Sequence, residues 1–419
     1  MKRHQRSAFA IYLIMTGADW LISSLFTTVV YVYLAKYVTD DPFQLVLIST
    51  VFTITVFLFE IPTGVVADVY SRRLSVIIGF TLLGIGALVE GVFQIFELVL
   101  LSQVVLGVGF TFISGARDAW ITDEIGEERV GQAYLRGSQV GQIGFLVAIP
   151  ISTALGTIAL NLPIVLAGTL FLLLAVFLVM VMPEEGFQHR SEEEHKSWRT
   201  MFRTLSEGVR LVRGRTVLIA ILLISAVYGL SSSGFDNLWT VNILENLTFP
   251  SIGNFEPVVW FGLFNIVVTI LGLAGTEISR RKVDISSQAG IVRILMFLTS
   301  ATAICMVIFG LTRDFWLAAT VYCLSITFRR TSDPILRTWI TQNTETNVRA
   351  TVLSMDSQVN SVGQVIGGSA IGAIGSVISL PAALVTTGLA RVPVAMLFAR
   401  LVLQDKRKRE ETLERRIEI

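Results

Sequence analysis

A short polar break between two long apolar runs reads Gly64-Val65-Val66-Ala67-Asp68-Val69-Tyr70-Ser71-Arg72-Arg73. Asp68 contributes a negative charge, and Arg72 and Arg73 contribute two positive charges close beside it. The apolar runs on either side are each long enough to cross a hydrocarbon core of roughly 30 Å, which takes about 20 helical residues. The stretch therefore predicts a loop between two transmembrane helices that carries a compact set of charges.

The composition extends this pattern to the whole chain. Of the 419 residues, 53% are hydrophobic and 16% are charged, whereas soluble domains carry about a quarter charged residues. We therefore expect an all-α membrane protein with twelve transmembrane helices. Their predicted limits are 8–36, 44–67, 75–95, 98–122, 132–157, 161–182, 216–243, 256–278, 288–311, 314–334, 351–377 and 380–402.

The distribution of lysine and arginine predicts the orientation. With both termini inside, the predicted inside loops hold nearly all the basic loop residues, and the outside loops hold only Lys36 and Arg313. Lysine and arginine are enriched on the cytoplasmic side of membrane proteins. We expect a multi-pass protein of the cell inner (plasma) membrane with cytoplasmic termini. The first apolar run reaches about Val38, too long for a signal peptide.

The chain contains an internal repeat. The same offset relates Trp120-Ile121-Thr122 to Trp339-Ile340-Thr341 and Ser138-Gln139 to Ser357-Gln358. Two halves of equal orientation form a parallel repeat, in which alternating access is one half rocking on the other. The predicted parts are an N-terminal half (1–182), a cytoplasmic linker with an interfacial helix (183–215), a C-terminal half (216–403) and a cytoplasmic tail (404–419).

The segment 64–73 resembles the loop signature of the major facilitator superfamily, G-x-x-x-D-x-x-G-R-[RK]. Ser71 stands where the signature has glycine. The second half keeps Gly272, Arg280 and Arg281 of this pattern. The resemblance implies the twelve-helix fold of that superfamily and a secondary active transporter.

Two further segments resemble the bacterial macrolide/tetracycline-efflux-like branch of drug exporters. They are Ser114–Glu124 and Gly234–Trp239. The glycines of the antiporter signature are not kept around Pro150, and Gln103 stands where an arginine of helix four is usual. Both departures weaken the implied proton antiport.

Several carboxylates lie inside predicted spans, where a charge at the helix centre costs about 2.5–3.5 kcal/mol and calls for an explanation. A buried carboxylate takes up a proton more readily than one in water. Asp19, Asp236 and Glu60 are therefore the proton-coupling candidates. Each also has a purely structural alternative: Asp19 lines a water-filled cavity, Asp236 caps a local helix break, and Glu60 pairs with a neighbouring residue. Glu90 is expected to extend to the outer interface instead.

A cytoplasmic gate is predicted from charges that can lock the two halves in one conformation by charge-assisted hydrogen bonds. The alternative is that the arginines only orient the chain. Arg117 and Asp118 are adjacent on a helix and are not expected to pair with each other, whereas Arg330 and Asp333 are spaced to pair. The predicted gate residues are Gly64, Asp68, Arg72, Arg73, Arg117, Asp118, Asp123, Arg280 and Arg281.

The predicted function is proton-coupled export of hydrophobic or amphipathic drugs, giving antibiotic resistance. An uptake symporter for a nutrient or lipid-like solute and a non-transporting sensor remain alternatives. The sequence suggests no enzyme, no cofactor, no metal site and no nucleic-acid partner; a small molecule, protons and the bilayer are the expected partners of a monomer. Aromatic residues that could line the substrate path are Trp20, Trp239, Trp260 and Phe264.

Overall fold

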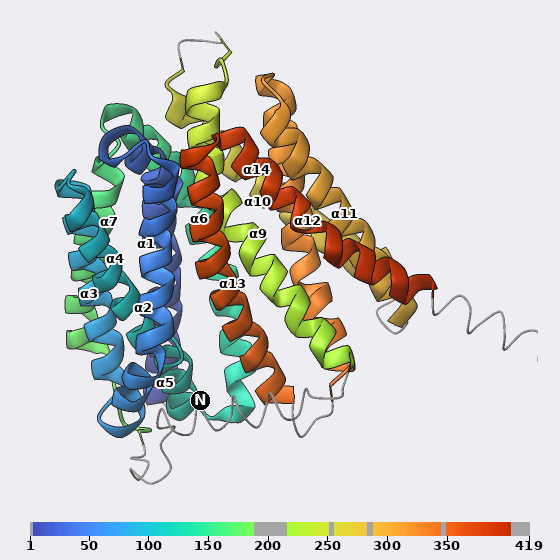
Figure 1. The fold of residues 1–419 in the computed structure, drawn as a ribbon. Helices are drawn as coiled ribbons and strands as arrows, with labels where there is room; N and C mark the ends of the chain where they lie inside the picture. The colour runs from blue at the N-terminus through green and yellow to red at the C-terminus, as the bar shows by residue number, and fades with distance from the viewer. Residues whose placement is uncertain (1–2, 188–215, 251–254, 283–287, 345–348, 404–419) are drawn as a thin grey trace, which may run out of the picture. The chain divides into compact units, whose positions relative to one another are not determined.

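The computed structural model describes residues 3–187, 216–250, 255–282, 288–344 and 349–403. Every regular element in these ranges is a helix (Figure 1). The elements up to the linker are α1 (Arg3–Tyr33), the π-helical turn η1 (Leu34–Val38), α2 (Pro42–Val69), α3 (Arg72–Val92), α4 (Phe96–Ile113), α5 (Ala116–Ile125), α6 (Glu127–Ile158) and α7 (Leu162–Val181). Those that follow are α9 (Thr216–Asn246), α10 (Pro257–Lys282), α11 (Gln288–Leu311), α12 (Phe315–Gln342), α13 (Arg349–Val377) and α14 (Leu380–Leu389).

These helices form twelve segments of membrane-spanning length, which confirms the predicted fold class. The turn η1 extends α1, α5 continues α4, and a helix over 392–403 continues α14 after a turn. Ten of the segments are long and apolar enough to cross a membrane. The predicted limits differ mostly by a few residues, although α12 runs on to Gln342 instead of ending near residue 334.

Local chemistry explains where several helices begin and end. The side chain of Asp41 accepts a hydrogen bond from the backbone N–H of Phe43, and Ser71 accepts one from that of Leu74. Such N-caps satisfy N–H groups that have no partner in the first turn. Between α4 and α5, Gly115 has a φ of 75°, a backbone region that favours glycine. This break in the fourth span was not predicted.

Contacts divide the chain into two compact units. The first comprises 1–203 and 251–266, and the second comprises 204–250 and 267–419, so α10 contributes to both. In the first unit α1 packs along α6, and α3 packs against α4 and α7. In the second unit α9 packs along α13, and α11 packs against α12 and α14. Each unit thus pairs its first span with its fifth and its third span with its fourth and sixth.

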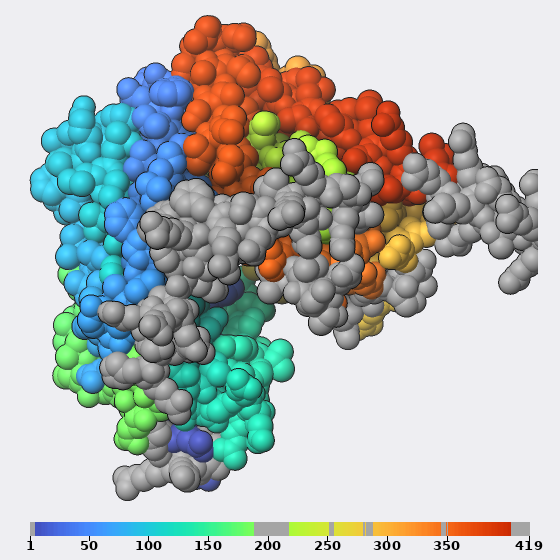
Figure 2. Space-filling model, turned by 60° about the horizontal axis from the view of Figure 1, so that its bottom comes forward, coloured from blue at the N-terminus to red at the C-terminus, as the bar shows by residue number. Residues whose placement is uncertain are grey.

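The outer faces of the helices are apolar. The helices of the first unit are seen in blue to teal in the space-filling view of Figure 2. Ile158 is 76% exposed and Val377 is 83% exposed, whereas side chains such as Phe80, Trp120 and Phe398 lie buried inside their units. An apolar exterior of this extent suits contact with lipid. The predicted interfacial helix and the tail lie outside the described residues.

Close helix contacts rely on glycine in both units. A Cβ atom added at Gly137 would lie 2.8 Å from Cε1 of Tyr12, and one added at Gly141 would lie 2.9 Å from Cγ of Trp20. These contacts join α6 to α1. In the second unit, a Cβ at Gly363 or Gly367 would collide with the backbone of α9. Small residues let helices in a membrane approach this closely.

Candidate functional site

An ion pair joins the first and fourth spans of the first unit. Nη1 of Arg117, in the first turn of α5, lies 2.7 Å from Oδ2 of Asp19 in the middle of α1. Ser23 donates a hydrogen bond of 3.3 Å to Oδ1 of the same carboxylate. The Arg117 and Asp19 side chains are 23% and 18% exposed. Asp19 therefore has a cation as its partner, which sequence analysis left unassigned.

The second unit holds an ion pair in the corresponding spans. Arg329 on α12 donates two hydrogen bonds to Asp236 on α9, from Nη1 to Oδ1 at 2.6 Å and from Nη2 to Oδ2 at 2.8 Å. Parallel bonds of this kind are a property of the planar guanidinium group. Arg330 and Asp333, which are spaced to pair, form no ion pair with each other among the described residues, and Arg329 is the arginine that engages Asp236. In both units the first span supplies the aspartate and the fourth supplies the arginine.

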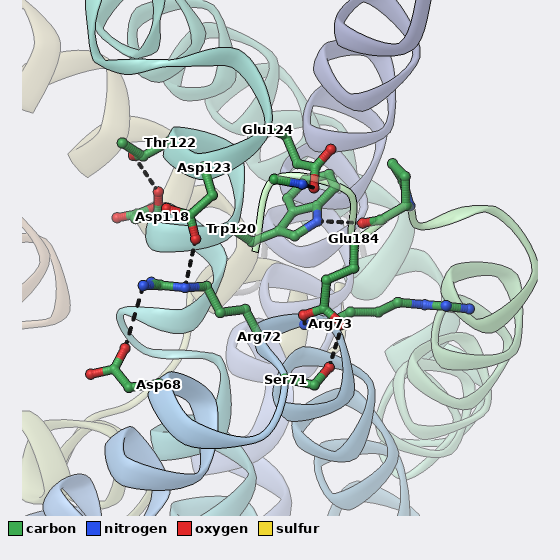
Figure 3. Close-up of polar contacts among 12 residues, drawn as sticks. Asp68, Ser71, Arg72, Arg73, Asp118, Trp120, Thr122, Asp123, Glu124 and Glu184 are labelled. Atoms are coloured by element: carbon green, nitrogen blue, oxygen red, sulfur yellow. Dashed lines mark hydrogen bonds and ion pairs between the residues drawn. The ribbon is translucent and has the colours of Figure 1, made fainter. Parts of the chain in front are cut away.

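A third charged group lies where α2 ends, α3 begins and α5 ends (Figure 3). Nε of Arg72 lies 2.8 Å from Oδ2 of Asp123, and Nη2 of Arg72 lies 3.5 Å from Oδ1 of Asp68. The Arg72–Asp123 contact is short enough for an ion pair, but the N–H group of Arg72 Nε is not directed at the carboxylate as a hydrogen bond requires. The Arg72 side chain is only 8% exposed. These three residues, which we call the Arg72 network, all belong to the first unit.

The Arg72 network adjoins the residues that follow α7. Glu184 accepts a hydrogen bond of 2.6 Å from the Ser71 hydroxyl and one of 2.9 Å from the backbone N–H of Arg73. Trp120 on α5 donates from Nε1 to the carbonyl of Pro183 at 2.7 Å. A carboxylate at a helix N-terminus satisfies free N–H groups and interacts favourably with the helix dipole. Ser71, which departs from the family glycine, thus caps α3 and also binds Glu184.

Sequence reasoning missed Glu184, because only the fold brings it to the start of α3. The nearest sequence signal is its place at the end of the sixth span, one residue after Pro183. The side chain of Arg73 contacts the carbonyl of Val179 on α7. Arg73 therefore joins α3 to the sixth span.

Glu90 does not extend to the interface as expected. Glu90 is 0% exposed, and its carboxyl group lies against α4. Gln103 Nε2 lies 2.7 Å from Glu90 Oε2 and Ser102 Oγ lies 3.2 Å from the same atom. Gln103, which stands where the family usually has arginine, is thus a direct neighbour of a buried carboxyl group.

The remaining polar candidates have varied settings. Glu60 is exposed on α2 and has no side-chain partner among the described residues. Arg117 Nε lies 3.8 Å from Asp118 Oδ1, so the expectation that these neighbours make no contact is corrected, although the distance exceeds a hydrogen bond. Arg281 pairs with Glu277 on its own helix at 2.6 Å. Gly64 has open space around it, and the side chain of Arg280 lies outside the described residues.

The aromatic candidates are not gathered into one set of ring contacts. Trp239 is 8% exposed and stacks on Tyr322, with ring centroids 4.0 Å apart. Trp20 is 39% exposed and meets Phe145 edge-on. Trp260 and Phe264 are buried on α10. Among the described residues, no group of three or more His, Cys, Asp or Glu side chains is arranged to hold a metal ion.

The comparisons with known proteins agree with this architecture. The family model of the Major Facilitator Superfamily matches residues 9–368. The chain belongs to this superfamily. It is a multi-pass membrane transporter of that fold.

Relatives within the superfamily are distant. The chain is 22% identical over 355 residues to the MFS-type transporter YxaM of Bacillus subtilis (strain 168), covering 82% of this chain and 83% of the relative. Among solved structures it is similar to the nucleoside transporter NupG, with a TM-score of 0.75, 14% identity and coverage of 94% and 98%. A bacterial homologue of the human lysosomal transporter Spinster gives a TM-score of 0.72 at 15% identity, with coverage of 97% and 99%. At these identities the structural likeness shows the fold alone.

Proposed function

We propose that this transporter is a proton-coupled antiporter that exports hydrophobic or amphipathic drugs by alternating access. The observation that carries the proposal is the Asp19–Arg117 ion pair, which places a protonatable group within a membrane span. Protonation of Asp19 removes its charge and weakens its attraction for Arg117. A proton arriving from outside thereby changes the energy of a contact between α1 and α5.

The Arg72 network supplies a second element of the proposed cycle. Arg72 is held by Asp68 and Asp123, and Glu184 caps the adjacent helix start. This arrangement supports a gate at the end of the first unit where α2 meets α3. In the proposal the network stabilises one conformation, and its rearrangement accompanies opening. The predicted gate role of Arg281 has less support, because its described partner is Glu277 of the same helix.

The test is accumulation of amphipathic drugs in a drug-sensitive bacterial host that expresses the full chain, with and without a protonophore. Export predicts lower accumulation that the protonophore abolishes. Asp19→Asn should lose this effect at equal expression, whereas Glu97→Gln, at an exposed position in the first turn of α4, should retain it. Unchanged protonophore-sensitive export by Asp19→Asn would contradict the assigned role of Asp19.

A proton-coupled uptake symporter is the second candidate. The departures from the antiporter pattern, which are the missing glycines around Pro150 and Gln103 in place of the usual arginine, favour this alternative over the antiporter branch. Purified protein in liposomes distinguishes the two by the direction of solute movement under an imposed proton gradient. Accumulation with the proton gradient would support uptake, and movement of no solute would support the sensor alternative.

A further inference from the structure

Glu90 occupies a closed site near the end of α3. Its carboxyl group contacts Gln103 Nε2 and Ser102 Oγ, both through Oε2, while Oε1 is buried without a hydrogen-bond partner. Both neighbours are uncharged. No lysine or arginine side chain forms an ion pair with Glu90 in the part of the chain that the structure describes. An ionised carboxylate would therefore have no compensating cation here.

Close helix packing keeps water from this site. A Cβ atom added at Gly86 would lie 2.7 Å from Cγ of Leu106 on α4, and one added at Gly91 would lie 2.9 Å from Cγ2 of Val165 on α7. The flanking helices thus approach α3 directly on both sides of Glu90. Burying an unpaired charge is costly, and such a group is more stable when neutral.

The other titratable groups near Glu90 offer no counter-charge. Tyr33, from α1, donates a hydrogen bond of 2.9 Å from its hydroxyl group to the backbone carbonyl of Glu90. Glu97 lies in the first turn of α4 and is exposed. Of the helices against which α3 packs here, α4 and α7 bring no described cation into contact with the carboxyl group.

The hydrogen-bond donors around Glu90 also indicate that its carboxyl group is neutral. The Ser102 hydroxyl has one proton, and it lies 2.7 Å from the carbonyl of Val99 and 3.2 Å from Glu90 Oε2. When this proton is donated to the shorter contact, it is not available to Glu90. An ionised carboxylate can only accept hydrogen bonds, whereas a protonated one can donate. An ionised Glu90 would thus share the single Ser102 proton with Val99 and would leave Oε1 without a donor among the described residues.

We propose that Glu90 is a proton-binding site, formed with Ser102 and Gln103 between α3 and α4, and that it is occupied while these helices are packed as described. The site is separate from Asp19, which has Arg117 as its counter-charge. The proposal goes beyond the proposed function and is independent of the direction of transport and of the substrate. Its ligand is the proton itself.

Infrared difference spectroscopy of the full chain in liposomes at neutral pH tests the proposal. A protonated carboxyl group and a carboxylate absorb at separate frequencies. Wild type minus Glu90→Gln should contain the band of one protonated carboxyl group, and Glu97→Gln should leave that band in place. A difference spectrum that contains only carboxylate bands would overturn the proposal, whatever the outcome of transport assays.

Variants of Gln103 retain Glu90 and provide a second measurement if Glu90→Gln does not fold. Gln103→Arg introduces a cation beside the carboxyl group and should replace the protonated band by carboxylate bands. Gln103→Leu adds no charge and should keep the protonated band. Carboxylate bands for Glu90 in Gln103→Leu as well as in wild type would show that burial does not hold the proton.

Discussion

Asp19 on α1 and Arg117 on α5 form an ion pair, with Oδ2 and Nη1 2.7 Å apart, although 98 residues separate them along the chain. The other described contacts of the two charges are longer: Ser23 donates a hydrogen bond of 3.3 Å to Asp19, and Asp118 lies 3.8 Å from Arg117 Nε. The pair therefore links the stability of the first unit to the protonation of one carboxylate.

A double-mutant cycle measures this link. Asp19→Asn leaves Arg117 without its partner, and Arg117→Gln leaves Asp19 unpaired. Each single variant should lose about 1–3 kcal/mol of stability, because a partly buried charge is left without its main partner. The double variant should lose less than the sum of the two, measured as the apparent Tm of purified protein. Additive losses would show that the two side chains do not act as a pair.

Arg329 should not tolerate replacement by lysine. Its two parallel hydrogen bonds to Asp236 require a planar guanidinium group, which the single ammonium group of lysine cannot reproduce. We expect Arg329→Lys to lower the apparent Tm and transport at least severalfold. The neighbouring Arg330 is exposed and forms no ion pair among the described residues, so Arg330→Lys is the matched control. Equal effects of both variants would argue against a specific role of the pair.

The Arg72 network should control transport more than expression. Asp123→Asn removes the charge that lies 2.8 Å from Arg72 Nε. Removing the partner charge of a nearly buried arginine costs about 1.5 kcal/mol or more, so the balance between conformations should shift by tenfold or more. Initial transport rates at matched protein levels provide the measurement. Glu128→Gln, at an exposed position in the first turn of α6, should leave the rate unchanged.

Glycine substitutions separate close packing from helix propensity. A Cβ atom at Gly367 on α13 would collide with the backbone of Leu230 on α9, so Gly367→Ala should force the two helices apart and reduce the apparent Tm. Gly131 on α6 has nothing within 4 Å of an added Cβ atom. Gly131→Ala should be neutral or stabilising by up to about 1 kcal/mol, because alanine favours helix more than glycine does. Tolerance of Gly367→Ala would contradict the described α9–α13 contact.

Much of the fold could be predicted because its signals are local. A span of α11 from Gln288 to Leu311 follows directly from a run of apolar residues, and its predicted limits were the same. The constant offset between Trp120 and Trp339 indicated two similar halves, and the helix pairing within each unit follows the same order. The charges at Asp68, Arg72 and Arg73 were recognisable from their spacing, and their gating role stays a prediction.

The sequence by itself determined the spans, the repeat and the charged residues inside apolar spans, because hydropathy and residue spacing depend only on the order of residues in the chain. Only the tertiary structure decided that Arg117 pairs with Asp19, that Glu184 caps α3 and that Glu90 is buried against Gln103. Each of these contacts depends on which faces of the helices pack together and on how the helices are shifted along their axes. That arrangement results from the packing of whole helices, so no local pattern around any one of these residues specifies its partner.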